Sequence, residues 1–336
     1  MTAVANPRTG APQESAAEAL APGASWGTAR TVLRLHRTAL VLWTLVVIGL
    51  SGFLVWLGTV AADDERAAME ACDRAGQDLC DTTFSGWSGF ASGMGLIGLF
   101  LTYSFIAVAA FAGGALIGRE LENGTAHLAW TQGISPVRWL TAKLAVPALV
   151  LTTSTTALVL LHRWVWDGNR DLLYDDWMGE AFPTRGPAAV AYVLCALAVG
   201  ALSGFLLRRP LPALAVATGA TWALSFVLAL YRGSLWPTVT STSTTDGEPY
   251  LPDSAWQMAS GALVHGRPAN VEYWRCEGGD AEMRRCLDDL GVTGYYTSYH
   301  PESHYWPLQL METGIVLAVA ALATAAAYWL VRRRTA

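Results

Sequence analysis

The chain has 336 residues and a formal net charge of −5, and 53% of its residues are hydrophobic while only 15% are charged. Soluble globular domains carry about 25% charged residues, so this composition excludes an ordinary soluble protein and indicates a membrane protein. The net charge is modest, and we expect no nucleic-acid partner. Residues 1–25 are rich in Ala, Pro and Ser without an apolar run. They predict a disordered tail, because such a segment buries too little apolar surface to fold.

Apolar segments long enough to cross a membrane follow this tail. A spanning helix needs roughly 20 mostly apolar residues. Six segments meet this length: 39–62, 93–117, 144–161, 187–207, 211–231 and 313–331. The expected fold class is therefore an all-α membrane protein with six transmembrane helices, which form one domain over residues 26–336. The fourth and fifth spans are separated only by Arg-Arg-Pro, so we expect them to form an antiparallel hairpin.

The charges of the connecting segments predict the orientation. With the N-terminus in the cytoplasm, the internal segments 1–38, 118–143, 208–210 and 332–336 hold 12 basic and 4 acidic residues. The external segments 63–87, 162–186 and 232–312 hold 10 basic and 23 acidic residues. Basic residues close to the ends of spans remain in the cytoplasm. The sequence thus predicts cytoplasmic N- and C-termini and a large external loop, 232–312, before the last span.

Four of the five cysteines lie in predicted external loops. Cys72 and Cys80 share the first loop and Cys276 and Cys286 the last, while Cys195 lies in the fourth span. Close pairs on the oxidising side of a membrane indicate possible disulfides, and free thiols are the alternative. The spacings are not those of paired zinc ligands, so we expect no metal site.

Motifs for catalysis are missing from the sequence. It has no G-x-x-x-x-G-K-[ST] phosphate-binding loop, no H-E-x-x-H and no G-x-S-x-G. We therefore expect no enzyme activity, no catalytic residue and no cofactor bound by this chain. His300 and His304 are four residues apart, but Pro301 and aromatic neighbours favour a role in loop packing over a metal site.

Ionisable residues are almost absent from the spans, with Glu312 at the outer edge of the sixth as the nearest exception. Carriers coupled to protons or sodium need such residues near the middle of the bilayer, so the spans argue against secondary transport. The third and fourth spans instead contain Ser, Thr and Gly, as in "LTTSTTALVL" and "GALSGF". These residues either pack helices together or line a weakly polar substrate path.

A compact polar insert, 118–143, interrupts the second and third spans. An amphipathic pattern runs through Leu121, Thr125 and Leu128, and Gly133 and Pro136 then mark a break. This pattern predicts two short helices joined by a turn just beneath the membrane. Two tryptophans, Trp130 and Trp139, indicate a structured surface and not an irregular connection.

The segment "GALIGRELENGTAHLAWTQGISPVRWLTAKL" resembles the cytoplasmic signature of ABC-2-type transporter permeases, especially those of actinobacteria. In that signature a Glu is followed by Gly-Thr, a Leu, a short turn, and then Arg and Lys before the third span. The matching residues here are Glu120, Gly124, Thr125, Leu128, Ile134, Ser135, Arg138 and Lys143. The segment "YHPESHYWPLQLMETGI" is similar to the aromatic, proline-containing segment before the last span of the same family.

The resemblance implies that this chain is the permease subunit of an ATP-driven exporter in the plasma membrane of a bacterium. The insert 118–143 is then a coupling segment that docks on a separately encoded P-loop ATPase, which binds the ATP-Mg. A second permease copy, in a homodimer or a heterodimer, and membrane lipids are the other implied partners. The implied docking residues are Arg119, Glu120, Leu121, Gly124, Thr125, Leu128, Trp130, Arg138 and Lys143.

Two alternatives remain open on the sequence. The residues of the insert would otherwise only cap helix ends and lie along the membrane interface. The whole chain would otherwise be a signalling or accessory protein whose external loop, 232–312, binds a ligand or an envelope partner. The resemblance also implies short re-entrant or interfacial helices in that loop, close to the sixth span.

Overall fold

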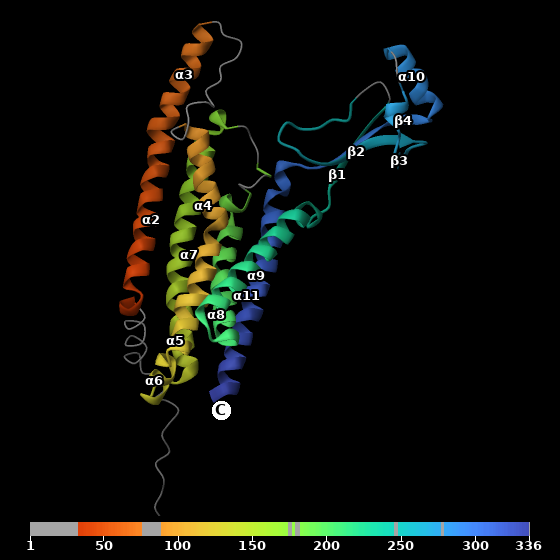
Figure 1. Ribbon diagram of the computed structural model, residues 1–336. Coiled ribbons are helices and arrows are strands. Elements are labelled where there is room, and N and C mark those ends of the chain that lie inside the picture. The colour runs from red at the N-terminus through yellow and green to blue at the C-terminus, as the bar shows by residue number, and fades with distance from the viewer. Residues whose placement is uncertain are drawn as a thin grey trace, which may run out of the picture.

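The described residues of the chain, in a computed structural model, are 33–75, 89–173, 177–178, 182–244, 248–276 and 279–335. They form a bundle of long helices with a small sheet at one end (Figure 1). The tail predicted for residues 1–25 lies outside the described residues.

Among the described residues, six helices are long and apolar enough to cross a membrane, as predicted. Several of them consist of an α-helix with a π-helical or 3-10 segment. In chain order the elements of these helices are α2 (Arg37–Trp56), η2 (Leu57–Ala61) and α3 (Ala62–Arg74); α4 (Phe90–Ala110), η5 (Phe111–Gly118) and α5 (Arg119–Glu122); α7 (Pro136–Gly168); α8 (Pro187–Leu207); α9 (Pro210–Tyr231) and η8 (Arg232–Ser234); and η10 (Glu302–His304) and α11 (Tyr305–Thr335).

The first three helices are longer than their apolar runs. The first continues without a break from η2 into the charged α3, which has three acidic residues in its first turn. In a continuous helix these residues have no helix start to stabilise, and two of them make other contacts: Glu65 accepts a hydrogen bond from the backbone N–H of Phe90, and Asp63 pairs with Arg66. An apolar run therefore predicts where a chain crosses the membrane and does not predict where the helix ends.

Helix α8 lies at the centre of the bundle, between α4, α7, α9 and α11. Its neighbours approach closely because it has glycines on the contact surface. A Cβ atom added at Gly200 would lie 2.9 Å from the backbone nitrogen of Gly113, and one at Gly204 would lie 2.8 Å from Cβ of Ile117. These two glycines thus have the packing role that was one of the two interpretations of "GALSGF".

The loop before the last span differs from the expected all-α structure. It contains β1 (Val239–Thr244), β2 (Trp256–Val264), β3 (Arg267–Ala269) and β4 (Val292–His300), with the 3-10 turn η9 (Tyr273–Arg275) and helix α10 (Asp280–Asp289) between β3 and β4. The strands form one antiparallel sheet in the order β1-β4-β2-β3. A disulfide joins Cys276 to Cys286 in α10.

The re-entrant helices expected in this loop are a wrong prediction for its described part. The segment just before α11 is strand β4 followed by the single 3-10 turn η10. Its sequence, "VTGYYTSYH", is rich in β-branched and aromatic residues, which favour strands. The strand propensity of the residues themselves was therefore a better guide than the resemblance.

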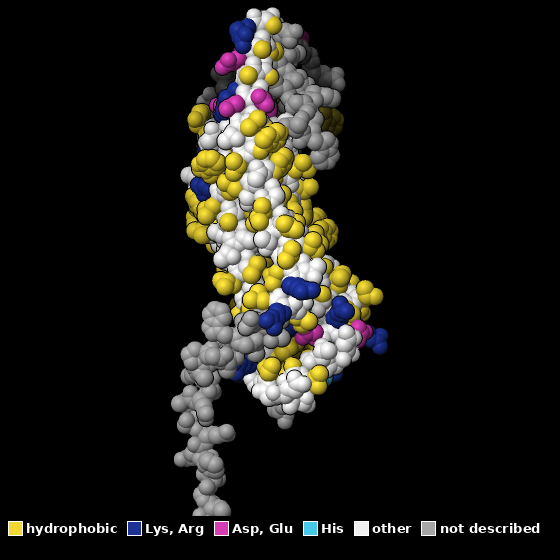
Figure 2. All heavy atoms as spheres, turned by 90° about the vertical axis from the view of Figure 1, so that its left-hand side faces the viewer, with side chains coloured by type: hydrophobic (Ala, Val, Ile, Leu, Met, Phe, Trp, Pro, Cys, Tyr) yellow, Lys and Arg dark blue, Asp and Glu magenta, His cyan; other side chains and the backbone are white. Residues whose placement is uncertain are grey.

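The insert between α4 and α7 lies at the other end of the bundle from the sheet (Figure 1). We call these two regions the insert end and the sheet end. Figure 2 shows the face formed by α2 and α3, with hydrophobic side chains over most of the bundle. Acidic side chains gather near α3, and basic side chains gather near the insert.

Candidate functional site

The insert forms two short helices joined by a turn, as predicted. Helix α5 ends at Glu122 and α6 runs from Thr125 to Thr131. Gly124, at the turn, has φ +71°, a left-handed conformation that costs glycine no steric energy. The Thr125 hydroxyl donates to the carbonyl oxygen of Glu120 at 3.2 Å, which fixes the angle between the two helices.

The start of the third span is also encoded locally. The Ser135 hydroxyl accepts a hydrogen bond from the backbone N–H of Arg138, and Pro136 occupies the first helical position of α7. Both features are typical helix-start signals. They separate α6 from α7 and so define the insert as an independent pair of helices.

A charged pair joins the insert to the third span. The Lys143 ammonium donates to the carboxylate of Glu120, and the two side chains are only 3% and 13% exposed. Lys143 also lies 3.0 Å from Nε2 of His36, which comes just before α2. Three chain segments that are far apart in sequence therefore meet at one buried lysine.

His36 is neutral at this position. Burial, together with the nearby positive charge of Lys143, lowers the pKa of His36 to about 4. A neutral imidazole accepts a hydrogen bond through one ring nitrogen, so the Lys143 ammonium is its donor. His36 could not be predicted as part of the site, because a single histidine before an apolar run carries no signal of its partner.

An aromatic row holds α6 against the bundle. Trp130 in α6 contacts Trp139 in α7 edge-to-face with ring centroids 5.9 Å apart, and Trp139 contacts Phe205 in α8 at 6.1 Å. Such pairs contribute about 0.5–1.5 kcal/mol each beyond the burial of their surface. The row links the insert to the central helix α8.

The structure divides the predicted docking residues into two groups. Leu128 is 58% exposed, and Arg119 and Thr125 are also exposed. The remaining members lie at the turn, are partly buried or are buried against the bundle: Glu120, Leu121, Gly124, Trp130, Arg138 and Lys143. Only the first group has exposed side chains, while the second group lies at the turn or against the bundle.

A cavity of about 580 Å³ lies between the insert and the starts of the first and third spans. Its lining includes Arg119, Glu120 and Lys143 together with His36 and Trp139. This volume is within the range of about 300–1,000 Å³ that is typical of ligand sites. The candidate site therefore combines an exposed helix surface with a cavity that has charged side chains in its lining.

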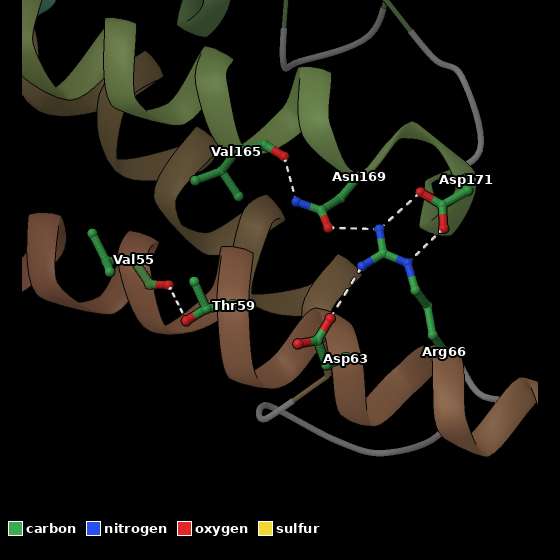
Figure 3. A network of polar contacts seen from close by, with 7 residues as sticks. All are labelled: Val55, Thr59, Asp63, Arg66, Val165, Asn169 and Asp171. Atoms are coloured by element: carbon green, nitrogen blue, oxygen red, sulfur yellow. Dashed lines mark hydrogen bonds and ion pairs between the residues drawn. The ribbon is translucent and has the colours of Figure 1, made fainter.

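The sheet end of the first helix is held by a second polar cluster (Figure 3). The Arg66 guanidinium in α3 donates to both carboxylate oxygens of Asp171, at 2.8 and 3.0 Å, and to Oδ1 of Asn169 at 2.8 Å. Asn169 in turn donates to the carbonyl oxygen of Val165 at 2.8 Å. The Arg66 hydrogen bond lowers the pKa of the Asp171 carboxyl.

A buried charged network joins three spans at the sheet end. Nε of Arg232, just after α9, donates to Glu312 in α11 at 2.8 Å. The Tyr192 hydroxyl in α8 donates to the same carboxylate at 2.8 Å, and Glu312 is 0% exposed. The one ionisable residue that the sequence placed at the edge of the sixth span is thus fully paired.

The described cysteines with predicted disulfides and the pair His300 and His304 belong to the sheet end. Cys72 is disulfide-bonded, and Cys80 lies outside the described residues. His300 and His304 share a contact of 2.9 Å between their Nδ1 atoms, and Nε2 of His300 contacts the carbonyl oxygen of Gly233 at 2.9 Å. Within the described part of the chain no group of three or more His, Cys, Asp or Glu residues is arranged to hold a metal ion.

The fold defines a multi-pass membrane protein, and a comparison with protein families gives its class. The family model described as "ABC-2 membrane transporter related" matches residues 44–232, more than half of the 336 residues. The chain therefore belongs to this family of membrane transport components, whose members generally work with a separate ABC ATPase subunit. Searches of curated proteins and of solved structures find no match.

The matched region contains the insert and ends at Arg232, where the sheet region begins. The family is thus established on the first five spans and on the candidate site between the second and third. The second resemblance in the sequence, within residues 299–315, lies beyond the matched residues and stays a prediction.

Proposed function

We propose that this chain is the membrane-spanning subunit of an ATP-driven exporter and that its α5–α6 insert docks on a separate P-loop ATPase. The observation that carries the proposal is the division of the insert into anchored and exposed residues. Trp130 and the Glu120–Lys143 pair fix the insert to the bundle, while Leu128 extends from it. An exposed leucine on a rigid, anchored helix is suited to a hydrophobic groove of a partner.

The distribution of charge supports the orientation that this proposal requires. Basic side chains gather at the insert end and acidic ones near α3 on the face shown in Figure 2. Basic residues near span ends favour the cytoplasm, where an ATPase has access to ATP. The sheet region would then face outward, in the compartment where the Cys276–Cys286 disulfide is stable.

The proposed mechanism is the transfer of motion from the ATPase to the bundle. Closure of two ATPase subunits on ATP would displace α6, and the Trp130–Trp139–Phe205 row would transmit that displacement to α8. Helix α8 packs against α9 and α11, which lead to the sheet end. Rigid displacement of packed helices is an established way to couple two distant sites.

The decisive experiment is co-purification of the tagged chain with a P-loop ATPase encoded beside its gene. Wild type and Gln132→Asp, a charge change at an exposed residue next to α6 outside the docking set, should retain the ATPase. Leu128→Asp should lose at least nine-tenths of it without a change in the unfolding temperature. Equal retention by the two variants, or no ATPase with wild type, contradicts the proposal.

The signalling or accessory alternative rests on a different observation, the exposed aromatic side chains of the sheet region. Tyr250 is 73% exposed and Trp274 is 71% exposed. If this region binds a ligand or an envelope partner as the main function, Tyr250→Ser/Trp274→Ser abolishes activity while Leu128→Asp does not. The proposed exporter function predicts the opposite result for the same two variants.

A further inference from the structure

Two cavities adjoin at the seam between the first helix and the rest of the bundle. The polar cavity of about 580 Å³ beside the insert and an apolar cavity of about 370 Å³ both have His36 in their lining. The apolar cavity lies between α2, α4 and α7, and its lining includes Trp43, Phe111 and Val150. A cavity with charged side chains in its lining that adjoins an apolar cavity at His36 has the chemistry of an amphiphile site.

The polar cavity has one net positive charge. Its ionised lining residues are Arg119, Lys143 and Glu120, and His36 is neutral. Lys143 and Glu120 form a pair, whereas Arg119 is exposed and has no ion-pair partner among the described residues. A guanidinium of this kind binds a phosphate through two parallel hydrogen bonds. One phosphodiester, with a charge of −1, would balance the cavity.

The apolar cavity opens toward the lipid phase. Leu42 and Val46, on its α2 side, are 60% and 40% exposed on a helix that crosses the membrane. The seam is closed deeper in the bundle by a hydrogen bond from Nε1 of Trp43 to Oγ of Ser154 at 2.9 Å. A hydrocarbon chain can therefore enter from the bilayer.

We propose that this seam binds one anionic phospholipid, with the phosphodiester at Arg119 and an acyl chain in the groove between α2 and α7. Basic pockets between transmembrane helices are known to bind acidic headgroups. The lipid would join α2 to the insert at the point where α6 is anchored. The site requires no ATPase, so it stands or falls separately from the proposed docking function.

The test is native mass spectrometry of the full chain purified in detergent that contains phosphatidylglycerol or phosphatidylcholine. Wild type should retain one phosphatidylglycerol per chain and should bind phosphatidylcholine at least tenfold more weakly. Arg119→Gln should weaken phosphatidylglycerol binding by at least about 10- to 100-fold, because that is the effect of losing even one of the two charged hydrogen bonds. Arg138→Gln is the matched control, because Arg138 is on the same insert but outside both cavities.

A second pair of variants tests the acyl-chain groove independently of charge. Val150→Trp fills the apolar cavity and should abolish retention of either lipid, whereas Leu149→Trp, on the exposed side of α7, should not. Equal binding of the two lipids by wild type, or no loss with Arg119→Gln and Val150→Trp, overturns the proposal. Lipid binding that occurs only after residues 1–32 are deleted would also overturn the proposal, because that segment would then be what occupies the groove in the full chain. Displacement by inorganic phosphate alone would show a free-anion site and would also overturn it.

Discussion

The insert end and the sheet end each contain a buried pair of opposite charges, but the surroundings of the two pairs differ. At the insert end, Lys143 and Glu120 lie beside a cavity of about 580 Å³. At the sheet end, Arg232 and Glu312 are closed in by Tyr192 and the helices around them, and Glu312 has no exposed surface. One buried pair of opposite charges thus borders a cavity, and the other is fully enclosed by the protein.

This difference indicates different mobility at the two ends. Breaking a sealed pair leaves a charge without water, so the three helices joined by Glu312 separate only at a high cost in free energy. A pair beside a cavity can exchange its partner for water or for another anion at a lower cost. We therefore infer that the insert end is the adjustable end of the bundle and the sheet end the fixed one.

The largest effect is expected when the sealed pair is broken. Glu312→Ala leaves Arg232 buried without its carboxylate and should lower the free energy of unfolding by about 3–5 kcal/mol. Thermal unfolding in detergent measures the change. The apolar replacement Arg232→Met/Glu312→Leu/Tyr192→Phe removes every member of the network and should recover most of the loss. A single variant as stable as wild type would show that the sheet end is not fixed by this network.

Removal of the disulfide should cause a smaller loss of stability, confined to the sheet region. Cys276 and Cys286 are separated by 10 positions, and closing so short a loop restricts the unfolded chain by roughly 2–3 kcal/mol. Cys276→Ser/Cys286→Ser should make the sheet region sensitive to limited proteolysis while the helical bundle stays resistant. Simultaneous loss of both regions would mean that the two regions unfold as one unit.

The Glu120–Lys143 pair at the insert end should contribute less to the free energy of unfolding than the sealed Arg232–Glu312 pair. Glu120→Gln removes the negative charge opposite Lys143, and we expect a loss of about 1–3 kcal/mol because water in the cavity solvates the ammonium in part. Hydrogen exchange should increase in α5 and α6 but not in β4 or α11. Adding Lys143→Met should restore protection, since no unpaired charge then remains. A loss equal to that of Glu312→Ala would remove the proposed difference between the two ends.

The smallest effect is expected from a lower pH, which should destabilise the insert end and not the sheet end. His36 has a pKa of about 4 when buried against Lys143 and 6.5 when released, so release binds a proton between these values. The stabilisation that comes from burying neutral His36 beside Lys143 is therefore fully present above pH 6.5 and is lost as the pH falls toward 4. At the sheet end, the pKa of Asp171 is lowered from 3.8, so its bond to Arg66 persists until the pH falls below that value.

Hydrogen exchange at pH 7 and pH 5 tests this difference directly. Exchange in α5 and α6, corrected for the intrinsic rate, should rise at pH 5, while exchange in α3 should not. His36→Gln, which keeps a hydrogen-bond acceptor for Lys143 but does not titrate, should remove the response. If that variant responds as wild type does, His36 is not the titrating group at the insert end.

The sequence could predict those parts of the site that depend on local signals. Gly133 and Pro136 act on the backbone within a few residues, so the break between the insert and the third span followed from residue type, whereas the position of the turn between α5 and α6, at Gly124, was not predicted. The partners of Glu120 and Lys143 could not be predicted from their positions alone. The family resemblance implies both residues for docking, which stays a prediction, and the structure shows that they pair with each other.

The sequence by itself determined the six spans, because a run of about 20 apolar residues has few other stable places than a bilayer. It also predicted a polar insert of two short helices between the second and third spans. Only the tertiary structure decided that the loop before the sixth span forms a sheet and that Lys143 faces His36. The β1–β4 pairing and the contacts of Lys143 with Glu120 and His36 join residues more than 20 positions apart, and no local sequence pattern indicates which distant residue is the partner.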